Sequence, residues 1–369
     1  MYLALREIRF ARGRFALMGS VVALITLLLV MLSGLTSGLA RQNTSALEEL
    51  PADLIVFGAV QDDPSYAESA VTAEQQEVWS GTDGVDRADA LGISQAQIET
   101  GDAAADGAAS VAVFGVGPDS SAAPADAPSG APSGAPDDEE IVLSADVAEQ
   151  LDADAGATVA VGAEQLTVAA VVPDQWYSHT PVVWTSLGSW QDIAARGDPD
   201  SFATVLAVSG GSGTEIEAES ADSAADTESI SPAESYSALP SYSSENGSLT
   251  MMQGMLYLIS GLVIAAFLTV WTVQRTRDIA VLKALGASTR YVLRDALAQA
   301  LLVLLAGAAL GGTAGLVGGL LAREAAPFTL SALTTVAPAG GVVLVGLAAA
   351  ALAVRRVARV DPMLALGGG

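Results

Sequence analysis

Few side chains in this chain of 369 residues are suited to covalent or metal chemistry. It has one histidine, His179, one lysine, Lys283, and no cysteine. Nucleophilic catalysis usually couples a serine or cysteine to a histidine base, and no nucleophile-elbow motif accompanies His179. A metal cluster of histidines and cysteines is excluded because the chain lacks the ligands. We therefore do not expect the chain to be an enzyme.

The position of the single lysine also excludes a phosphate-binding loop, and with it an ATPase within this chain. A phosphate-binding loop places its lysine after a glycine, whereas Lys283 follows Leu282. The segment 277–288 around it is a short charged helix pattern between two apolar runs, in which Ile279, Leu282 and Leu285 recur at three-residue spacing. That stripe predicts a surface that a soluble partner grips.

Composition predicts a membrane protein. The chain is 51% hydrophobic yet carries a formal net charge of -26. One ordinary globular domain does not combine so high an apolar content with so large a charge. Four apolar segments are long enough to be transmembrane helices, namely 16–39, 248–273, 296–321 and 337–354. A cleaved signal peptide is the rival interpretation of the first segment, but the segment is too long and no convincing cleavage site follows it.

The basic residues predict the orientation, because Lys and Arg collect at the cytoplasmic ends of membrane spans. Twelve of the 16 lie in three segments that we expect to be cytosolic. These are an N-terminal amphipathic segment 1–15, a coupling loop and helix 274–295 and a tail 355–369. Both termini are then cytosolic, and the domain 40–247 and the short loop 322–336 lie outside.

The outer domain carries 37 of the 42 acidic residues and three of the 16 basic ones. Such a charge argues against nucleic acid or an anionic lipid surface as its partner. Short apolar and alternating runs predict strands, which are 54–60, 110–116, 140–144, 158–161, 165–172, 181–185 and 203–209. Helix patterns interleave at 72–79, 144–151 and 187–195, with Ser144 as an N-cap. We predict an α+β domain with disordered insertions at 118–138 and 210–234.

Glycines with four-residue spacing predict close helix contacts. Gly307, Gly311, Gly315 and Gly319 leave one face of the third apolar helix without side chains, and Gly34 and Gly38 repeat the pattern in the first. Helix packing is the expected use. The face at Gly34 and Gly38 could equally serve a dimer contact or a flat ligand.

Three features together resemble the permease subunits of the MacB/FtsX class (type VII) of ABC transporters. They are the four-helix layout with a large domain after the first helix, the segment 277–288 and the ending Arg359-Val-Asp-Pro-Met-Leu-Ala-Leu366. The resemblance implies a homodimer of permeases on two copies of a cytosolic ATPase subunit that binds ATP and magnesium. It assigns ATPase coupling to Arg277, Asp278, Ile279, Leu282, Lys283, Leu285 and Gly286.

A closer likeness within the class is to haem-exporter permeases of the HrtB type. The segments 2–10, 32–43, 176–179 and 241–246 and the glycine-rich tail look like theirs. Permeases of the DevC type, linked to glycolipid export, share part of the pattern, and the acidic insertions depart from both. The likeness implies a pump in the bacterial cell membrane, surrounded by membrane lipid, that exports haem when the ATPases move the helices.

Haem as a transported substrate needs an apolar slot, an iron ligand and cations for its propionates. We expect Glu245 or Tyr242 to be the iron ligand, because a carboxylate that enters a bilayer is costly without a partner or a task. The other candidates are Met31, Met251, Met252, Met255, Tyr177, His179, Arg41 and Arg323. The sequence leaves two other functions open, a permease for a lipid, amphiphile or drug and an FtsX-like regulator of a cell-wall hydrolase that transports nothing.

Overall fold

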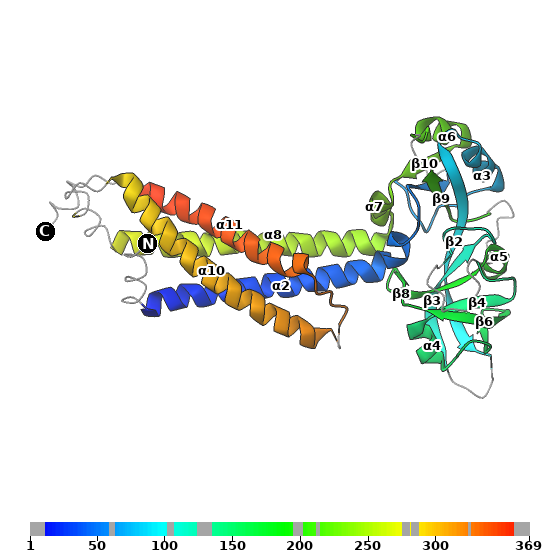
Figure 1. Cartoon of the computed structure of the whole chain (residues 1–369), viewed down its shortest axis with the longest axis horizontal. Helices are drawn as coiled ribbons and strands as arrows, with labels where there is room; N and C mark the ends of the chain where they lie inside the picture. The colour runs from blue at the N-terminus through cyan, green and yellow to red at the C-terminus, as the bar shows by residue number, and fades with distance from the viewer. Residues whose placement is uncertain are drawn as a thin grey trace. The chain divides into compact units, whose positions relative to one another are not determined.

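The structure is a computed structural model that describes residues 12–58, 63–101, 107–123, 135–194, 202–211, 215–274, 281, 288–323 and 326–357. The chain divides into two compact units. A helical unit comprises Met1–Leu39 and Asn246–Gly369, and an α+β unit comprises Ala40–Glu245. The α+β unit is thus inserted between the first and second apolar helices (Figure 1).

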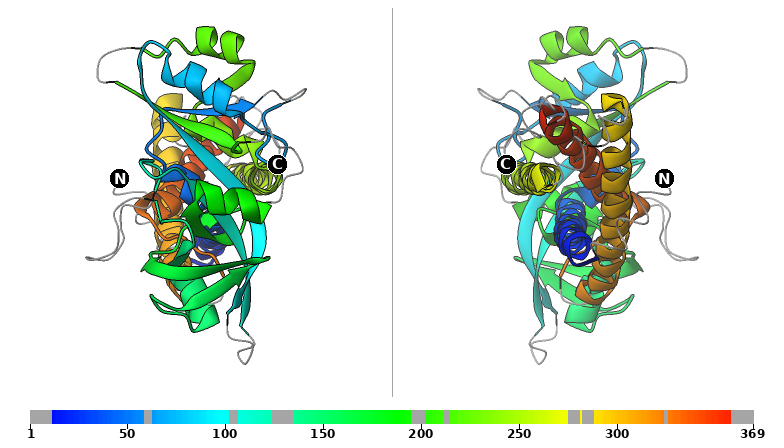
Figure 2. Two further views of the ribbon diagram at one scale, coloured as in Figure 1. Left: turned by 90° about the vertical axis from the view of Figure 1, so that its right-hand side faces the viewer. Right: turned by 90° about the vertical axis from the view of Figure 1, so that its left-hand side faces the viewer.

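Among the described residues, four helices are long and apolar enough to cross a membrane, with mean hydropathies from 2.1 to 2.7. They are α2 (Arg12–Glu48), α8 (Pro240–Gln274), α10 (Thr289–Ala322) and α11 (Ala332–Val357). Their inward faces share one core, to which α2 contributes Val22 and Leu29, α8 Ile264 and α10 Leu304. Figure 2 looks nearly along α2 and α8, with α10 and α11 running obliquely beside them. The expected fold class, four membrane helices plus an α+β domain between the first two, is confirmed.

The glycines of α10 lie against α2. A Cβ atom built on Gly307 would stand 2.9 Å from the carbonyl oxygen of Gly19, and one on Gly311 would stand 2.2 Å from the carbonyl oxygen of Ala23. Gly315 lies against Val30 in the same way. Any side chain at these positions would force the two helices apart, so the close approach of α2 and α10 requires glycine.

The glycines at the other end of α2 accommodate a loop. A Cβ atom on Gly34 would stand 2.2 Å from the ring of Phe328, and one on Gly38 would stand 2.0 Å from the carbonyl oxygen of Pro327. The Phe328 ring also covers Gly319 of α10. Within the described part of the helical unit, the Gly34 and Gly38 face therefore holds the connection between α10 and α11.

The α+β unit is built on one sheet. Within the described residues its strands are β1 (Leu54–Gly58), β2 (Val85–Thr100), β3 (Ala108–Val116), β4 (Glu140–Ser144), β5 (Thr158–Val161), β6 (Glu164–Val172), β7 (Trp176–Tyr177), β8 (Thr180–Ser186), β9 (Val205–Gly210) and β10 (Thr227–Ile230). They follow the order β10-β1-β9-β2-β3-β8-β4-β6-β5, and β7 pairs with β8. Strand β5 also pairs with the end of β2. The ring that this closes consists of β2, β3, β8, β4, β6 and β5.

The long strand β2 belongs to both halves of the sheet (Figures 1 and 2). Its first half pairs with β9 and its second half with β3 and β5. In the neighbouring strand β3, Val111 and Val113 face the core with Ile98, whereas Phe114 faces a second core with Trp184. Strand β3 is buried on both faces, which explains its continuous apolar sequence.

Short helices cover the sheet. They are α3 (Ala73–Ser80), α4 (Ala145–Leu151), α5 (Leu187–Ala194), α6 (Ala218–Ala225) and α7 (Pro232–Ser235). Ser144 does take the extended N-cap backbone before α4, but its hydroxyl makes no cap hydrogen bond. The side chain of Asp174 instead accepts a 2.7 Å hydrogen bond from the backbone N–H of Asp146 in the first turn.

Two predictions for this unit were wrong. Strand β2 was not predicted, and the stretch 210–234, predicted to be disordered, contains α6, β10 and α7. In α6 the small side chains of Ala221 and Ala225 are buried beside Trp79, while β10 pairs with the edge strand β1. Alanine gives little apolar signal, so the buried face of α6 escaped the sequence pattern. Residues 124–134 of the other predicted insertion lie outside the described residues.

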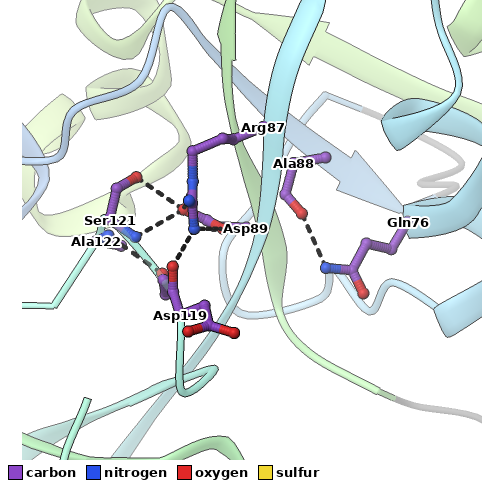
Figure 3. Close-up of polar contacts among 8 residues, drawn as sticks. Gln76, Arg87, Ala88, Asp89, Asp119, Ser121 and Ala122 are labelled. Atoms are coloured by element: carbon purple, nitrogen blue, oxygen red, sulfur yellow. Dashed lines mark hydrogen bonds and ion pairs between the residues drawn. The ribbon is translucent and has the colours of Figure 1, made fainter. Parts of the chain in front are cut away.

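Hydrogen bonds from an ion pair within β2 attach the start of this strand to the segment that follows β3 (Figure 3). A guanidinium nitrogen of Arg87 lies 3.0 Å from a carboxylate oxygen of Asp89. Asp89 also accepts hydrogen bonds from the backbone N–H and the hydroxyl of Ser121, at 2.9 and 2.7 Å. Arg87 donates to the carbonyl of Asp119 as well. One of the few basic residues of this acidic unit therefore has a structural role.

The glycine contacts between α2 and α10 predict a difference between two adjacent positions. Gly311→Ala places a methyl group against the backbone of α2, and we expect the overpacking to destabilise the protein by ~1–3 kcal/mol. Gly312→Ala is the control, because a Cβ atom there meets nothing within 4 Å. Both variants gain the same helix propensity, ~1 kcal/mol. Thermal unfolding in detergent should show a lower midpoint for Gly311→Ala alone, and equal midpoints would contradict the packing.

Candidate functional site

Glu245, on the first turns of α8, is the best-placed ligand candidate in the α+β unit. Its two carboxylate oxygens lie 3.0 and 3.1 Å from Nε2 of His179. The side-chain amide of Asn43 on α2 donates to the same carboxylate at 3.2 Å. The Glu245 side chain is 38% exposed, so the carboxylate is held by partners and still reachable from solvent.

A carboxylate only accepts hydrogen bonds, which settles the direction of these contacts. Nε2 of His179 and the amide nitrogen of Asn43 must both donate to Glu245, although the two nitrogens lie 3.1 Å apart. The amide oxygen of Asn43 accepts a 2.7 Å hydrogen bond from the hydroxyl of Ser241. The hydroxyls of Ser241 and Ser178 lie 3.1 Å apart and extend the network. We call these five residues, Asn43, Ser178, His179, Ser241 and Glu245, the turn clamp.

The turn that carries Ser178 and His179 has an unusual backbone. The two residues form the whole connection between β7 and β8, and both have positive φ, 48° and 66°. Two-residue hairpin turns of this type normally use Asn-Gly, because glycine adopts positive φ without strain. Each side chain in this region costs ~1–3 kcal/mol. The fold therefore keeps two non-glycine residues with a strained backbone at the point where their side chains reach Glu245 and Ser241.

The backbone of the turn also binds α2. The N–H of Ser178 donates to the carbonyl of Asn43 at 3.1 Å, and the N–H of His179 donates to the carbonyl of Gln42 at 2.8 Å. The hydroxyl of Ser45 accepts a 2.8 Å hydrogen bond from the N–H of Trp176. The hairpin is thus attached to the end of α2 through main-chain contacts that do not depend on Glu245.

The two tyrosine candidates differ in position. The half-buried Tyr242 packs edge-to-face on Tyr236, with ring centroids 5.9 Å apart, and burial raises the pKa of Tyr236. Tyr177 is 6% exposed, and its ring packs edge-to-face on Tyr66 and Phe114 in the core. The role of Tyr177 is therefore packing, in contrast to its expected place among the haem ligands. Arg41 is exposed on α2.

The remaining candidates lie in the helical unit. Met251, Met252 and Met255 follow on α8, with exposed fractions of 69%, 54% and 53%. Met31 packs on α10, where its sulfur would stand 3.1 Å from a Cβ atom on Gly318. Arg323 is exposed at the end of α10. The methionines of α8 are thus free to meet an apolar ligand or lipid, whereas Met31 is a packing residue.

The helical unit also has an apolar groove of about 810 Å³ between α2 and α10. Its lining includes Gly19, Ala23, Leu24, Ala306, Gly307 and Leu310. Ser20 is a polar residue in the lining, and its hydroxyl already donates to the carbonyl of Leu17 at 2.9 Å. The groove suits a hydrocarbon chain and offers little to a polar solute.

Most of the predicted ATPase-coupling segment lies outside the described residues, including Arg277, Asp278, Ile279, Leu282, Lys283, Leu285 and Gly286. Two residues of the segment are described. Val281 is helical and 48% exposed. Ser288 is the N-cap of α10, and its hydroxyl accepts a hydrogen bond from the N–H of Tyr291 at 3.2 Å.

Sequence reasoning named Glu245, Tyr242 and His179 but not the partners Asn43, Ser178 and Ser241. A signal existed, because all three lie in the segments 32–43, 176–179 and 241–246 that resemble haem-exporter permeases. In the turn clamp the imidazole of His179 donates to Glu245, while the hydroxyl of Ser241 donates to Asn43 and lies beside that of Ser178. The chemistry of the turn clamp is that of a binding site, with a carboxylate that could bind a metal centre or a cation. Among the described residues, no group of three or more His, Cys, Asp or Glu side chains could hold a bare metal ion.

Comparisons with known proteins agree with the helical architecture. Residues 250–362 match the family described as FtsX-like permease C-terminal. The chain is 24% identical over 370 residues to a Staphylococcus epidermidis protein whose name describes it as a hemin transport system permease, HrtB, and the match covers 100% of both chains. It is also 24% identical over 377 residues to an uncharacterized ABC transporter permease of Mycobacterium bovis, covering 100% of this chain and 99% of that one.

Among solved structures, the periplasmic region of MacB from Actinobacillus actinomycetemcomitans is similar with a TM-score of 0.36 and 11% identity, covering 50% of this chain and 90% of that chain. The extracellular domain of the ABC-type transporter YknZ gives a TM-score of 0.33 and 12% identity, covering 48% and 96%. The full-length relatives and the matched segment carry the assignment. This chain is a multi-pass membrane protein homologous to ABC transporter permeases, with an FtsX-like permease domain at residues 250–362.

Proposed function

We propose that the chain is the permease subunit of an ABC-type efflux pump that exports haem. The observation that carries the proposal is Glu245, a half-exposed carboxylate presented by α8 and held in place by His179 and Asn43. Exposed methionines follow on the same helix. The full-length similarity to a relative named for hemin transport supports haem as the cargo.

In this proposal Glu245, or Tyr242 three residues before it, coordinates the haem iron. The apolar side chains of Met251, Met252 and Met255 contact the macrocycle, and Arg41 and Arg323 are available for the propionates. The pump is a homodimer of permeases in the bacterial cell membrane, with both termini in the cytosol and the α+β unit outside. A separate ATPase subunit, two copies per pump, binds ATP and magnesium.

Energy enters the permease by mechanical transmission. The ATPase subunits grip the segment 277–288 and move it when they close on ATP. The movement tilts the helices of the dimer between two states, and the cargo leaves because one state binds it less tightly. The permease then needs no chemistry of its own, which accords with the scarcity of catalytic side chains.

A lipid or another amphiphile is the second candidate cargo. The apolar groove between α2 and α10 favours it, because a groove of about 810 Å³ lined by small and apolar residues accepts a hydrocarbon chain. Stimulation of the ATPase by lipid together with indifference to haem would identify this function in place of haem export.

Haem binding should depend on Glu245. We expect the purified permease with its ATPase to show a haem absorption band, and Glu245→Gln to lower the affinity for haem on the order of tenfold or more, because the amide cannot replace an anionic ligand. Glu228→Gln is the control, since Glu228 is an exposed residue on the edge strand β10. Tyr242→Phe tests the alternative ligand. An unchanged band in both Glu245→Gln and Tyr242→Phe would remove this site assignment.

The coupling stripe should be sensitive to charge. Replacing Leu282 and Leu285 together with Asp should abolish co-purification of the ATPase while the permease still folds, because buried carboxylates in the contact are costly. Val281→Asp adds one negative charge at a position beside the stripe, where the double variant adds two, and should be tolerated. Detergent size-exclusion chromatography separates the two results. If the ATPase stays bound to the double variant, the proposed gripping surface is wrong.

A further inference from the structure

The turn clamp holds the Glu245 carboxylate in a geometry that conflicts with its use as a ligand. Nε2 of His179 lies 3.0 Å from Oε1 and 3.1 Å from Oε2, so it stands between the two oxygens. A haem iron has only its axial positions free and binds a carboxylate through one oxygen, preferably by the lone pair that points toward the space between the two oxygens. Nε2 of His179 already occupies this space, so the imidazole competes with the iron for that lone pair.

We propose that His179 and the cargo compete for Glu245, and that closing the turn clamp expels the cargo. The inference rests on the proposed function, in which Glu245 binds the haem iron. When cargo binds, Glu245 leaves His179. When the clamp closes, His179 takes the carboxylate back and the iron loses its ligand. His179 and Asn43 are positioning residues, because they act on the cargo through Glu245.

The fold holds the turn of His179 on α2 for this exchange. Backbone hydrogen bonds from Ser178 and His179 to α2 hold the turn in place whether or not Glu245 is bound. Asn43 connects the network to α2 through its own helix and to Ser241 through a 2.7 Å hydrogen bond. The strained backbone of the turn, with φ values of 48° and 66°, aims the imidazole at the carboxylate. A relaxed turn of two glycines would offer no competing donor.

Competition for one carboxylate links cargo affinity to helix position. Any movement of α8 that brings Glu245 toward His179 lowers cargo affinity, and by reciprocity bound cargo favours the state in which the pair is open. An ATP-driven shift of the helix would thereby be converted into cargo release within the α+β unit.

The direction in which one substitution changes the affinity for haem tests this proposal. His179→Asn keeps a residue that tolerates positive φ but shortens the side chain so that it no longer reaches between the carboxylate oxygens. We expect the variant to bind haem about tenfold more tightly than wild type, since the competing hydrogen bond to a charged group is gone. The haem band should keep its position. Weaker binding or a shifted band would show instead that His179 supports or ligates the iron, and would overturn the proposal.

A cargo-free measurement tests the clamp separately. Hydrogen exchange of the full-length permease without haem should be faster at 240–246 in Glu245→Gln than in wild type, because the amide is a weaker acceptor for His179, whereas the amides of Ser178 and His179 keep their hydrogen bonds to α2. Glu228→Gln should leave exchange unchanged. Equal exchange in the two variants would show that the clamp does not exist. If wild type binds no haem at all, the proposed function and the competition both fail, whereas faster exchange in Glu245→Gln would still establish the clamp.

Discussion

Apolar packing of two helix ends on the sheet is the interaction on which the candidate site depends. Ala46, Leu47 and Leu50 at the end of α2 and Leu239 before α8 share one core with Phe57 and Trp184. Each buried leucine contributes ~1.5–3 kcal/mol. This core packs both helix ends beside the same hairpin, so Asn43, Ser241 and Glu245 reach the turn between β7 and β8. Polar contacts alone would not hold them there, because each hydrogen bond adds only ~0.5–1.5 kcal/mol.

A second close approach organises the helical unit, and its cause is the absence of side chains. Gly307 and Gly311 let the backbone of α10 touch that of α2, and Gly34 and Gly38 make room for the loop before α11. In hydrocarbon the gain comes from van der Waals contact, which falls off within fractions of an ångström. The same small residues leave the apolar groove beside the crossing. Tight packing and an accessible groove therefore have one origin.

Strands and helices with strong local patterns were predictable, and weakly patterned ones were not. Strands β3, β4, β6 and β8 are apolar enough to be recognised from the sequence, and α3, α4 and α5 follow clear helix patterns. Strand β2 contains charged residues and glutamines in a low-propensity sequence, yet it pairs with β9, β3 and β5. Its conformation is imposed by those neighbours. Helix α6 similarly depends on burying two alanines against Trp79, a contact that lies far away in the sequence.

The candidate site was likewise predictable from the sequence only in part. The sequence alone established the four apolar helices, the acidic inserted domain and the shortage of catalytic side chains, because length, hydropathy and residue supply are properties of the chain itself. It also singled out Glu245, since an ionisable residue beside an apolar run is costly. Only the tertiary structure placed His179 and Asn43 on that carboxylate and buried Tyr177 in the core. These contacts join positions 66 and 202 residues apart in the chain. No local pattern specifies such pairs, because folding around the shared core brings them together.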